Sequence, residues 1–382
     1  MCPKEDSAEM NGLPARNSPE WDNHENEEQE EEQIEYLEGS AFTKVEILRY
    51  IVSLKDFVDL NEGRSETTLC EIWDSIQTPS VATVYHENGL FEIVQHIFDK
   101  RDDFDDSERN RLLELLIGIM ANMLQHLDAI DELDIVLQNL ASFCEGETDV
   151  FILAQTMRAL SIIFKRFPTS VESSALISTF KTTANEIICK CKNEEALSNA
   201  LNLFESNDVF LDENGQKALW TFLEHFEEHE IEEIMTLEEN HFLQRILEIL
   251  SEVIYQKTDS LDEKQVRIIN SFWDRCNKEV EENKEEFSCI NEPWQFFAMI
   301  LYLAQISIQK CAAFRITEED LKRTFKTWKL SKSKIGGSIR KTLKVQISNL
   351  NQASRFDEIV EEESETEKNI LLILDSQLED DI

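Results

Sequence analysis

The segment "IMANML", residues 119–124, returns in altered form along the chain, and this repetition decides the fold that the sequence predicts. The related segments are, in chain order, "ALSIIF" (159–164), "ALSNAL" (196–201), "ILSEVI" (249–254) and "YLAQIS" (302–307). In the first three copies the fourth position holds Asn122, Ile162 and Asn199, which are 40 and 37 residues apart. A period near 40 residues is typical of armadillo and HEAT arrays, in which two or three helices form each repeat.

Apolar residues recur at helical spacing around these copies. The clearest stripe consists of Val150, Leu153, Ala154, Met157, Leu160 and Phe164. Further helices are predicted near 170–190, 194–206, 212–229, 240–256, 260–280 and 291–312. No stretch alternates as a strand does, and nine glycines and six prolines in 382 residues leave little turn chemistry for sheets.

These patterns predict an all-α protein built as an armadillo/HEAT-like α-solenoid. A single pair of helices cannot bury its apolar face, so neighbouring repeats stack and share one continuous core. A compact helical bundle is the alternative, because it shares the helix content, but it does not explain the period.

Composition divides the chain into three parts. Residues 1–40 hold acidic runs and few apolar groups, so we expect a disordered acidic arm. Residues 41–312 form the predicted armadillo-like repeat domain. Residues 313–382 are expected to be a basic and then acidic tail, partly helical or disordered.

The formal charge of −41 disfavours nucleic acid and anionic membranes as partners of the molecule as a whole. The eight cysteines are scattered without a C-x-x-C pair, which indicates free thiols in a reducing compartment. No apolar run is long enough for a membrane span, and the beginning of the chain does not read as a secretory signal. We expect a monomer without cofactors.

The stretch "LCEIWDSIQ", residues 69–77, places Cys70, Trp73 and Asp74 on about two turns of a helix. A reactive cysteine needs a nearby base and a lowered pKa, whereas Glu71 and Asp74 would raise the pKa of this thiol. The pattern therefore favours a structural role in which Trp73 anchors a repeat near the beginning of the array.

The segments "LCEIWDSIQTPSVATVYHENGLFEIVQHIF" (69–98) and "GIMANM" (118–123) carry a family resemblance. The chain resembles the serum amyloid A-like 1 family of armadillo-type proteins, clearly over about 65–127 and less closely to about 205. The matching residues are Cys70, Trp73, Asp74, Gly118, Ile119, Asn122 and Met123, whereas Met120 and Ala121 differ. The resemblance implies a non-enzymatic nuclear protein, with the cytoplasm as a second location, that is associated with cell proliferation and has no catalytic residues.

The repeated asparagines are the predicted binding residues. Residues on the third helix of armadillo repeats line a groove, where an asparagine can hydrogen-bond the backbone of an extended peptide. Asn122 and Asn199 are therefore expected to help a scaffold or adaptor hold an extended or basic segment of a partner protein. The alternative is that these asparagines join neighbouring repeats. A regulatory subunit of an enzyme complex would differ from a scaffold only in its partner.

A second class of function is suggested by "HFEEH", residues 225–229, which fits the H-x-x-E-H pattern of zinc hydrolases. His225 and His229 would bind the metal from one helix face. The required third metal ligand adds no support to this hypothesis. Acidic residues are so abundant in the chain that one is always near. Solvated histidines at a helix edge are the alternative.

The basic segment "LKRTFKTWKLSKSKIGGSIRKTLKVQ", residues 321–346, contains no acidic residue. It is expected to fold back on the acidic repeat domain. It could instead serve as a nuclear import signal, or contact nucleic acid through Phe325 and Trp328.

Overall fold

The computed structural model describes residues 36–60, 65–146, 149–168, 175–228, 240–257, 261–282 and 292–310, together with residues 320, 323, 324, 327, 345, 346 and 349. Throughout these ranges the protein is all-α and contains no sheet, as the sequence predicts. The only strand-like pairing in these ranges is an isolated antiparallel bridge between Tyr36 and Thr43. None of the described helices is long and apolar enough to cross a membrane.

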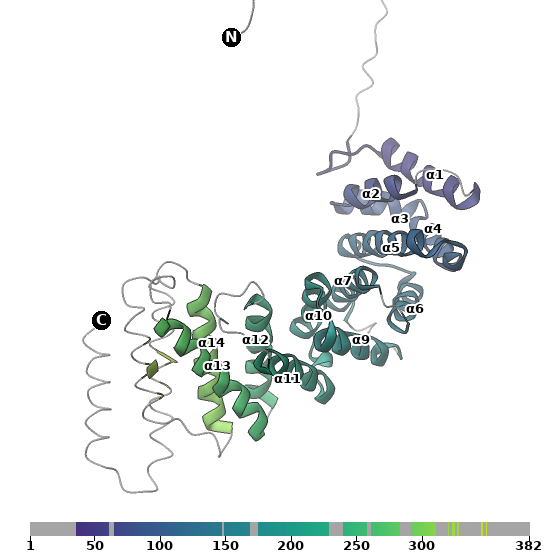
Figure 1. Ribbon diagram of the computed structural model, residues 1–382. Helices are drawn as coiled ribbons and strands as arrows, with labels where there is room; N and C mark the ends of the chain where they lie inside the picture. Colours follow the sequence, from purple (N-terminus) through teal and green to yellow (C-terminus); the bar gives the residue numbers. More distant parts are fainter. Residues whose placement is uncertain are drawn as a thin grey trace, which may run out of the picture. The chain divides into compact units, whose positions relative to one another are not determined.

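The helices follow one another with short connections (Figure 1). The α-helices are α1 (Lys44–Leu60), α2 (Ser65–Ser75), α3 (Pro79–Glu87), α4 (Leu90–Asp99), α5 (Asp106–His126), α6 (Leu133–Cys144), α7 (Val150–Arg166), α9 (Ile177–Lys190), α10 (Glu194–Ser206), α11 (Glu213–Glu228), α12 (Asn240–Lys257), α13 (Glu263–Glu282) and α14 (Glu292–Lys310). Two 3-10 turns, η1 (Arg101–Asp103) and η2 (Asp208–Phe210), lie between them.

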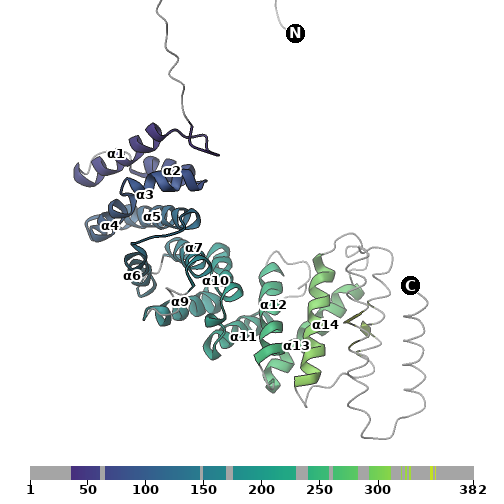
Figure 2. The same ribbon diagram turned by 180° about the vertical axis from the view of Figure 1, so that it is seen from behind.

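Helix packing follows a regular order, which can be traced in Figures 1 and 2. In one row α2 packs on α5, α5 on α7, α7 on α10, α10 on α12, and α12 on α14. In a second row α6 packs on α9, α9 on α11, and α11 on α13. Contacts between α6 and α7, α9 and α10, α11 and α12, and α13 and α14 join the two rows.

Buried apolar residues from α1 to α14 form one hydrophobic cluster. On α7, Ala154, Met157, Leu160 and Phe164 of the predicted stripe are buried. The other two stripe residues, Val150 and Leu153, are partly buried against the same cluster. A helix buried along one stripe leaves its opposite face free for other contacts.

Helix starts agree with the sequence at some places and differ at others. Thr78 caps α3 by accepting a hydrogen bond from the Val81 N–H, with Pro79 in the first turn. Asn88, a residue type that often begins helices, instead ends α3, and Gly89 precedes α4 at φ 81°. This left-handed conformation is easy only for glycine, so Gly89 makes the turn between the two helices.

The motif that carries the family resemblance has a packing role. A Cβ added at Gly118 of α5 would lie 1.8 Å from the indole ring of Trp73 on α2, so the two helices approach this closely only with glycine. Cys70 is partly buried against the core, Met123 is buried, and Asp74 is exposed. These positions agree with the structural role predicted for Trp73.

The packed region continues beyond the boundary near 312 that composition indicates. The indole N–H of Trp273 on α13 donates to Thr324 Oγ1 at 3.0 Å. Thr327 Oγ1 donates to Asn277 Oδ1 at 3.0 Å, and both threonines are fully buried. At the other end, Leu37 packs against the core although it precedes the predicted boundary at residue 41. Composition misses these contacts because single apolar or hydroxyl residues inside charged segments make them.

Candidate partner-binding groove

The two aligned asparagines make the same contact between successive helices. Asn122 on α5 donates from Nδ2 to the backbone carbonyl of Trp73 on α2 at 3.0 Å. Asn199 on α10 donates from Nδ2 to the backbone carbonyl of Ala154 on α7, also at 3.0 Å. These bonds support the alternative that the asparagines join neighbouring helices.

The surroundings of the two asparagines differ. Asn122 is only 9% exposed, and its Oδ1 accepts a hydrogen bond from Arg158 Nη2. Asn199 is partly exposed, and its Oδ1 accepts no hydrogen bond from the described part of the chain. Only Asn199 therefore keeps an atom available for a partner.

A groove of about 680 Å³ lies over α5, α7 and α10; we call it the α7 groove. Its lining residues are Gln125, Arg158, Ser161, Ile162, Lys165, Arg166, Asn199, Asn202, Glu205 and Ser206. The groove thus contains Asn199 and Ile162, the aligned residues of two copies of the repeated segment. Asn122 is not among the lining residues, because it is buried beneath Arg158.

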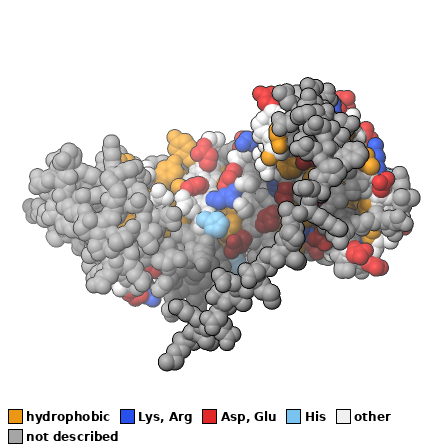
Figure 3. Space-filling view, turned by 90° about the horizontal axis from the view of Figure 1, so that it is seen from above, with side chains coloured by type: hydrophobic (Ala, Val, Ile, Leu, Met, Phe, Trp, Pro, Cys, Tyr) orange, Lys and Arg blue, Asp and Glu red, His pale blue; other side chains and the backbone are white. Residues whose placement is uncertain are grey.

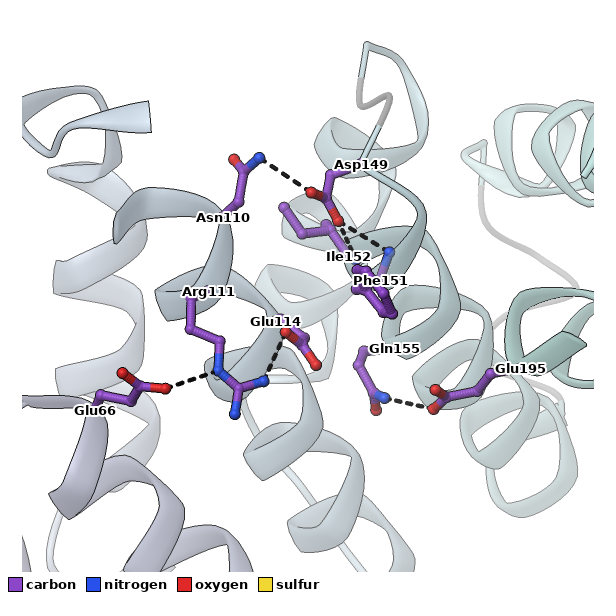
Figure 4. Close-up of polar contacts among 9 residues, drawn as sticks. All are labelled: Glu66, Asn110, Arg111, Glu114, Asp149, Phe151, Ile152, Gln155 and Glu195. Atoms are coloured by element: carbon purple, nitrogen blue, oxygen red, sulfur yellow. Dashed lines mark hydrogen bonds and ion pairs between the residues drawn. The ribbon is translucent and has the colours of Figure 1, made fainter. Parts of the chain in front are cut away.

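Arg158 is held at the groove by neutral and aromatic neighbours. Its guanidinium lies over the ring of Trp73, 5.7 Å from the centroid, and its Nη1 donates to Gln155 Oε1 at 3.3 Å. Gln155 Nε2 in turn donates to Glu195 Oε1 at 2.7 Å, as Figure 4 shows. Burial lowers the pKa of Arg158, but an arginine stays protonated at neutral pH.

The other charged residues of the α7 groove differ in how they are paired. Lys165 is exposed, and its ammonium makes no hydrogen bond or ion pair with any described residue. Arg166 is engaged, because its Nη2 donates to the Leu127 carbonyl at 3.0 Å and pairs with Asp128 at 2.9 Å. Glu205 is the acidic lining residue, and Arg245 Nε on α12 pairs with it at 2.6 Å.

The charge of this groove contrasts with the rest of the molecule. Helix α7 contains Arg158, Lys165 and Arg166 but no aspartate or glutamate, whereas each of the other described α-helices contains at least one. On the face drawn in Figure 3, acidic side chains are spread over the described surface and basic ones form small separate groups. The α7 groove is therefore a local concentration of positive charge.

A second set of polar contacts joins the N-terminal ends of α2, α5 and α7 (Figure 4). Arg111 of α5 pairs with Glu66 of α2 at 3.0 Å and with Glu114 at 2.8 Å. Arg111 and Glu66 are 44% and 66% exposed, so this contact contributes at most about 1 kcal/mol. Asn110 donates to Asp149 Oδ2 at 3.1 Å. These contacts fix α2, α5 and α7 relative to one another.

Only one of the two histidines of "HFEEH" belongs to the described residues. His225 is exposed on α11, and His229 lies outside the described residues. Within the ranges that the structure describes, no three histidine, cysteine, aspartate or glutamate side chains gather where they could hold a metal ion.

Most of the basic segment also lies outside the described residues. Of this segment, Arg323 pairs with Asp274 at 3.5 Å and with Glu281 at 3.7 Å, both on α13. This arginine thus contacts acidic residues of the helical domain, as the fold-back hypothesis expects. The import and nucleic-acid hypotheses stay predictions.

Burial makes several thiols poor nucleophiles. It raises the pKa of Cys144 to about 12 and also raises the pKa values of Cys189 and Cys276. A thiol must lose its proton to attack, so burial disfavours reaction of these three cysteines at neutral pH.

Comparison with known proteins adds no relative: no protein-family model matches the chain, and no curated protein matches it.

Sequence reasoning missed Arg158 and Lys165 as functional candidates. The signal that could have found them is the absence of acidic residues from Val150 to Arg166 in a chain with 78 of them. The groove itself could not be found in this way, because it requires α5, α7 and α10 to be neighbours.

Proposed function

We propose that the helices form an armadillo/HEAT-like α-solenoid that acts as a non-enzymatic scaffold or adaptor, and that the α7 groove holds an extended segment of a partner protein. Two observations support the solenoid: the helix rows pack in chain order, and Asn122 and Asn199 make the same kind of contact two steps apart along the first row. Stacked helical repeats commonly present an extended binding surface.

The observation that carries the proposed binding role is the set of unused polar groups in the groove. Asn199 Oδ1, Asn202 Nδ2 and Ser161 Oγ make no hydrogen bond with any described side chain or backbone group. An extended peptide carries one donor and one acceptor per residue, which these groups can satisfy without reading the sequence.

These hydrogen bonds account for only part of the affinity. Each contributes about 0.5–1.5 kcal/mol, whereas micromolar binding requires about 8 kcal/mol. Contacts to Ile162 and to the charged side chains of the groove must supply the remainder.

Site-specific crosslinking tests this proposal. A photoreactive amino acid at Ser161, in the groove, should capture a partner in cells, whereas the same residue at exposed Thr83 on α3 should not. The captured partner is then purified, and its dissociation constant is measured for the wild type, Ser161→Trp and Thr83→Trp. We expect a weakening of about tenfold or more for Ser161→Trp alone. Equal binding by both variants would place the partner elsewhere.

The resemblance to the serum amyloid A-like 1 family supports the further proposal of a nuclear protein associated with cell proliferation. Imaging of the tagged full chain in dividing cells tests the location directly. Exclusion from the nucleus would remove this part of the proposal and leave the groove untouched.

A further inference from the structure

We propose that the α7 groove selects an acidic segment of its partner, recognised through Arg158 and Lys165. This inference rests on the proposed peptide-binding function and specifies the chemistry of the peptide. It differs from the basic partner that the net charge of the chain favours. The reason for the difference is that a bound peptide contacts the lining of the groove directly and distant charges only through screened solvent. The lining of the α7 groove is cationic.

Arg158 is the first argument. Its side chain is half-buried, yet it forms no ion pair with a carboxylate in the described part of the protein. Its contacts are the ring of Trp73 and the amide oxygens of Asn122 and Gln155. These contacts orient the guanidinium, and Glu195 attracts it electrostatically without forming an ion pair with it. A partly desolvated cation that lacks a contacting counter-ion is costly. A carboxylate from a partner would remove this cost.

Lys165 is the second argument. It stands seven residues after Arg158 on α7, which is close to two helical turns and places both cations on the same side of the helix. At 1.5 Å per residue their backbones are about 10 Å apart along the helix axis. Two acidic residues separated by two others in a polyproline II peptide are about 9 Å apart and also share one side. The spacing thus fits an acidic residue at every third position.

Neighbouring charges leave these two cations available. Glu205 is paired with Arg245. Glu195, which accepts a hydrogen bond from Gln155, attracts Arg158 but forms no ion pair with it. Arg166 is engaged by the Leu127 carbonyl and by Asp128, so its guanidinium is less available to a ligand. The charged groove residues that form no ion pair with a described residue, Arg158 and Lys165, are therefore both positive.

Fluorescence anisotropy with defined peptides tests the inference on the full chain. The probe is a labelled peptide of three Glu-Pro-Pro repeats, and the matched controls replace each Glu by Gln, Lys or phosphoserine. At about 0.15 M ionic strength, screening limits the repulsion from distant acidic residues to about 8 Å. We expect the Glu peptide to bind at least about tenfold more tightly than the Gln or Lys peptides.

Charge-reversal variants locate the binding. Lys165→Glu should abolish binding of the Glu peptide without affecting the fold, because Lys165 is exposed and makes no hydrogen bond or ion pair with a described residue. Lys55→Glu, at an exposed position on α1, is the matched control and should bind as the wild type does. Equal losses in both variants would mean that the peptide senses only the total charge, which overturns the inference.

The remaining outcomes separate this inference from the proposed function. Preference for the Lys peptide, or binding of the phosphoserine peptide alone, overturns the acidic-segment inference. In either case the crosslinking at Ser161 can still succeed, and the groove remains a peptide site. Failure of crosslinking at Ser161 while the Glu peptide binds would instead leave a cationic, anion-binding site that no partner protein uses.

Discussion

Among single residues, Gly118 has the clearest structural reason for its identity. Alanine is usually the better helix former by about 1 kcal/mol, so propensity alone predicts that Gly118→Ala stabilises α5. The added Cβ, however, would lie within 2 Å of the Trp73 ring, and overpacking of this kind typically costs about 1–3 kcal/mol. The steric cost should exceed the gain in helix propensity, because the Trp73 ring cannot move without losing its contact with Arg158.

We therefore expect Gly118→Ala to lower the free energy of unfolding, measured by urea denaturation. Gly146→Ala is the control, because a Cβ added there would meet no atom within 4 Å. Similar stability of the two variants would show that α2 and α5 can separate at little cost.

The two asparagines should differ in their contribution to stability. Trp73 lies in the last turn of α2, where a carbonyl lacks an intrahelical donor, so Asn122 supplies its partner. Ala154 lies inside α7, where the helix already satisfies its carbonyl. We expect Asn122→Ala to cost about 1–3 kcal/mol and Asn199→Ala less, measured by thermal or urea unfolding.

Partner binding should show the opposite order. Asn199→Ala removes a groove atom and should weaken capture with a smaller loss of stability than Asn122→Ala, because Asn199 lines the groove. Loss of stability equal to that of Asn122→Ala would assign both asparagines to the fold alone.

The thiol of Cys144 should remain unreactive well above neutral pH. Burial raises its pKa from 9.0 to about 12 in the folded protein, so the thiolate forms more readily in the unfolded chain. Its contribution to stability is therefore complete below about pH 9 and is lost as the pH rises toward 12. Alkylation with iodoacetamide at pH 8, followed by peptide mass mapping, should label Cys144 only after denaturant is added. Rapid labelling of the native protein would contradict this.

At the scale of elements, the stability of α7 depends on the capping residue at its N-terminus. Asp149 accepts hydrogen bonds from the backbone N–H groups of Phe151 at 2.9 Å and Ile152 at 3.3 Å, and it also accepts one from Asn110. Asp149→Ala should therefore cost about 1–2 kcal/mol in the free energy of unfolding.

The matched variant is Asp149→Asn, which keeps an oxygen acceptor at the cap and should lose less. Asn110→Ala removes only the contact from α5 and should cost least. If Asp149→Ala unfolds like the wild type in urea, the cap does not limit the stability of α7.

The sequence predicted helices well and their first residues less well. The ranges 194–206 and 240–256 agree closely with α10 and α12, because long apolar stripes repeat every three or four residues. Thr148 and Asp149 both precede α7 in the sequence, and Asp149 is the residue that caps it. Both residue types can cap, and only the backbone conformation decides between them.

The groove was predictable only in part. Alignment identified Asn199 as a lining residue, because the aligned positions recur on the same face of successive helices. Arg158 and Lys165 were not predicted, because neither belongs to the repeated motif. Their role depends on whether neighbouring carboxylates form ion pairs with them. Only the packed structure shows which residues are their neighbours.

At the scale of the whole molecule, the charge of −41 should make stability depend on salt. Like charges repel more strongly in the compact state, and salt screens this repulsion. Raising the ionic strength from about 0.01 M to about 0.15 M shortens the screening length from about 30 Å to about 8 Å. We expect the melting temperature to rise by a few degrees over this range, measured by circular dichroism. A fall would mean that local ion pairs such as Arg245–Glu205 outweigh the general repulsion.

The hydrogen bonds from Trp273 and to Asn277 determine where the chain can be shortened. Cutting after Lys310, at the end of α14, would remove Thr324 and Thr327 and leave an indole N–H and an amide oxygen of α13 without their partners. The shortened protein would expose an apolar tryptophan face and tend to self-associate. A terminus placed after Thr327 keeps both bonds and is the safer choice for crystallisation or binding studies.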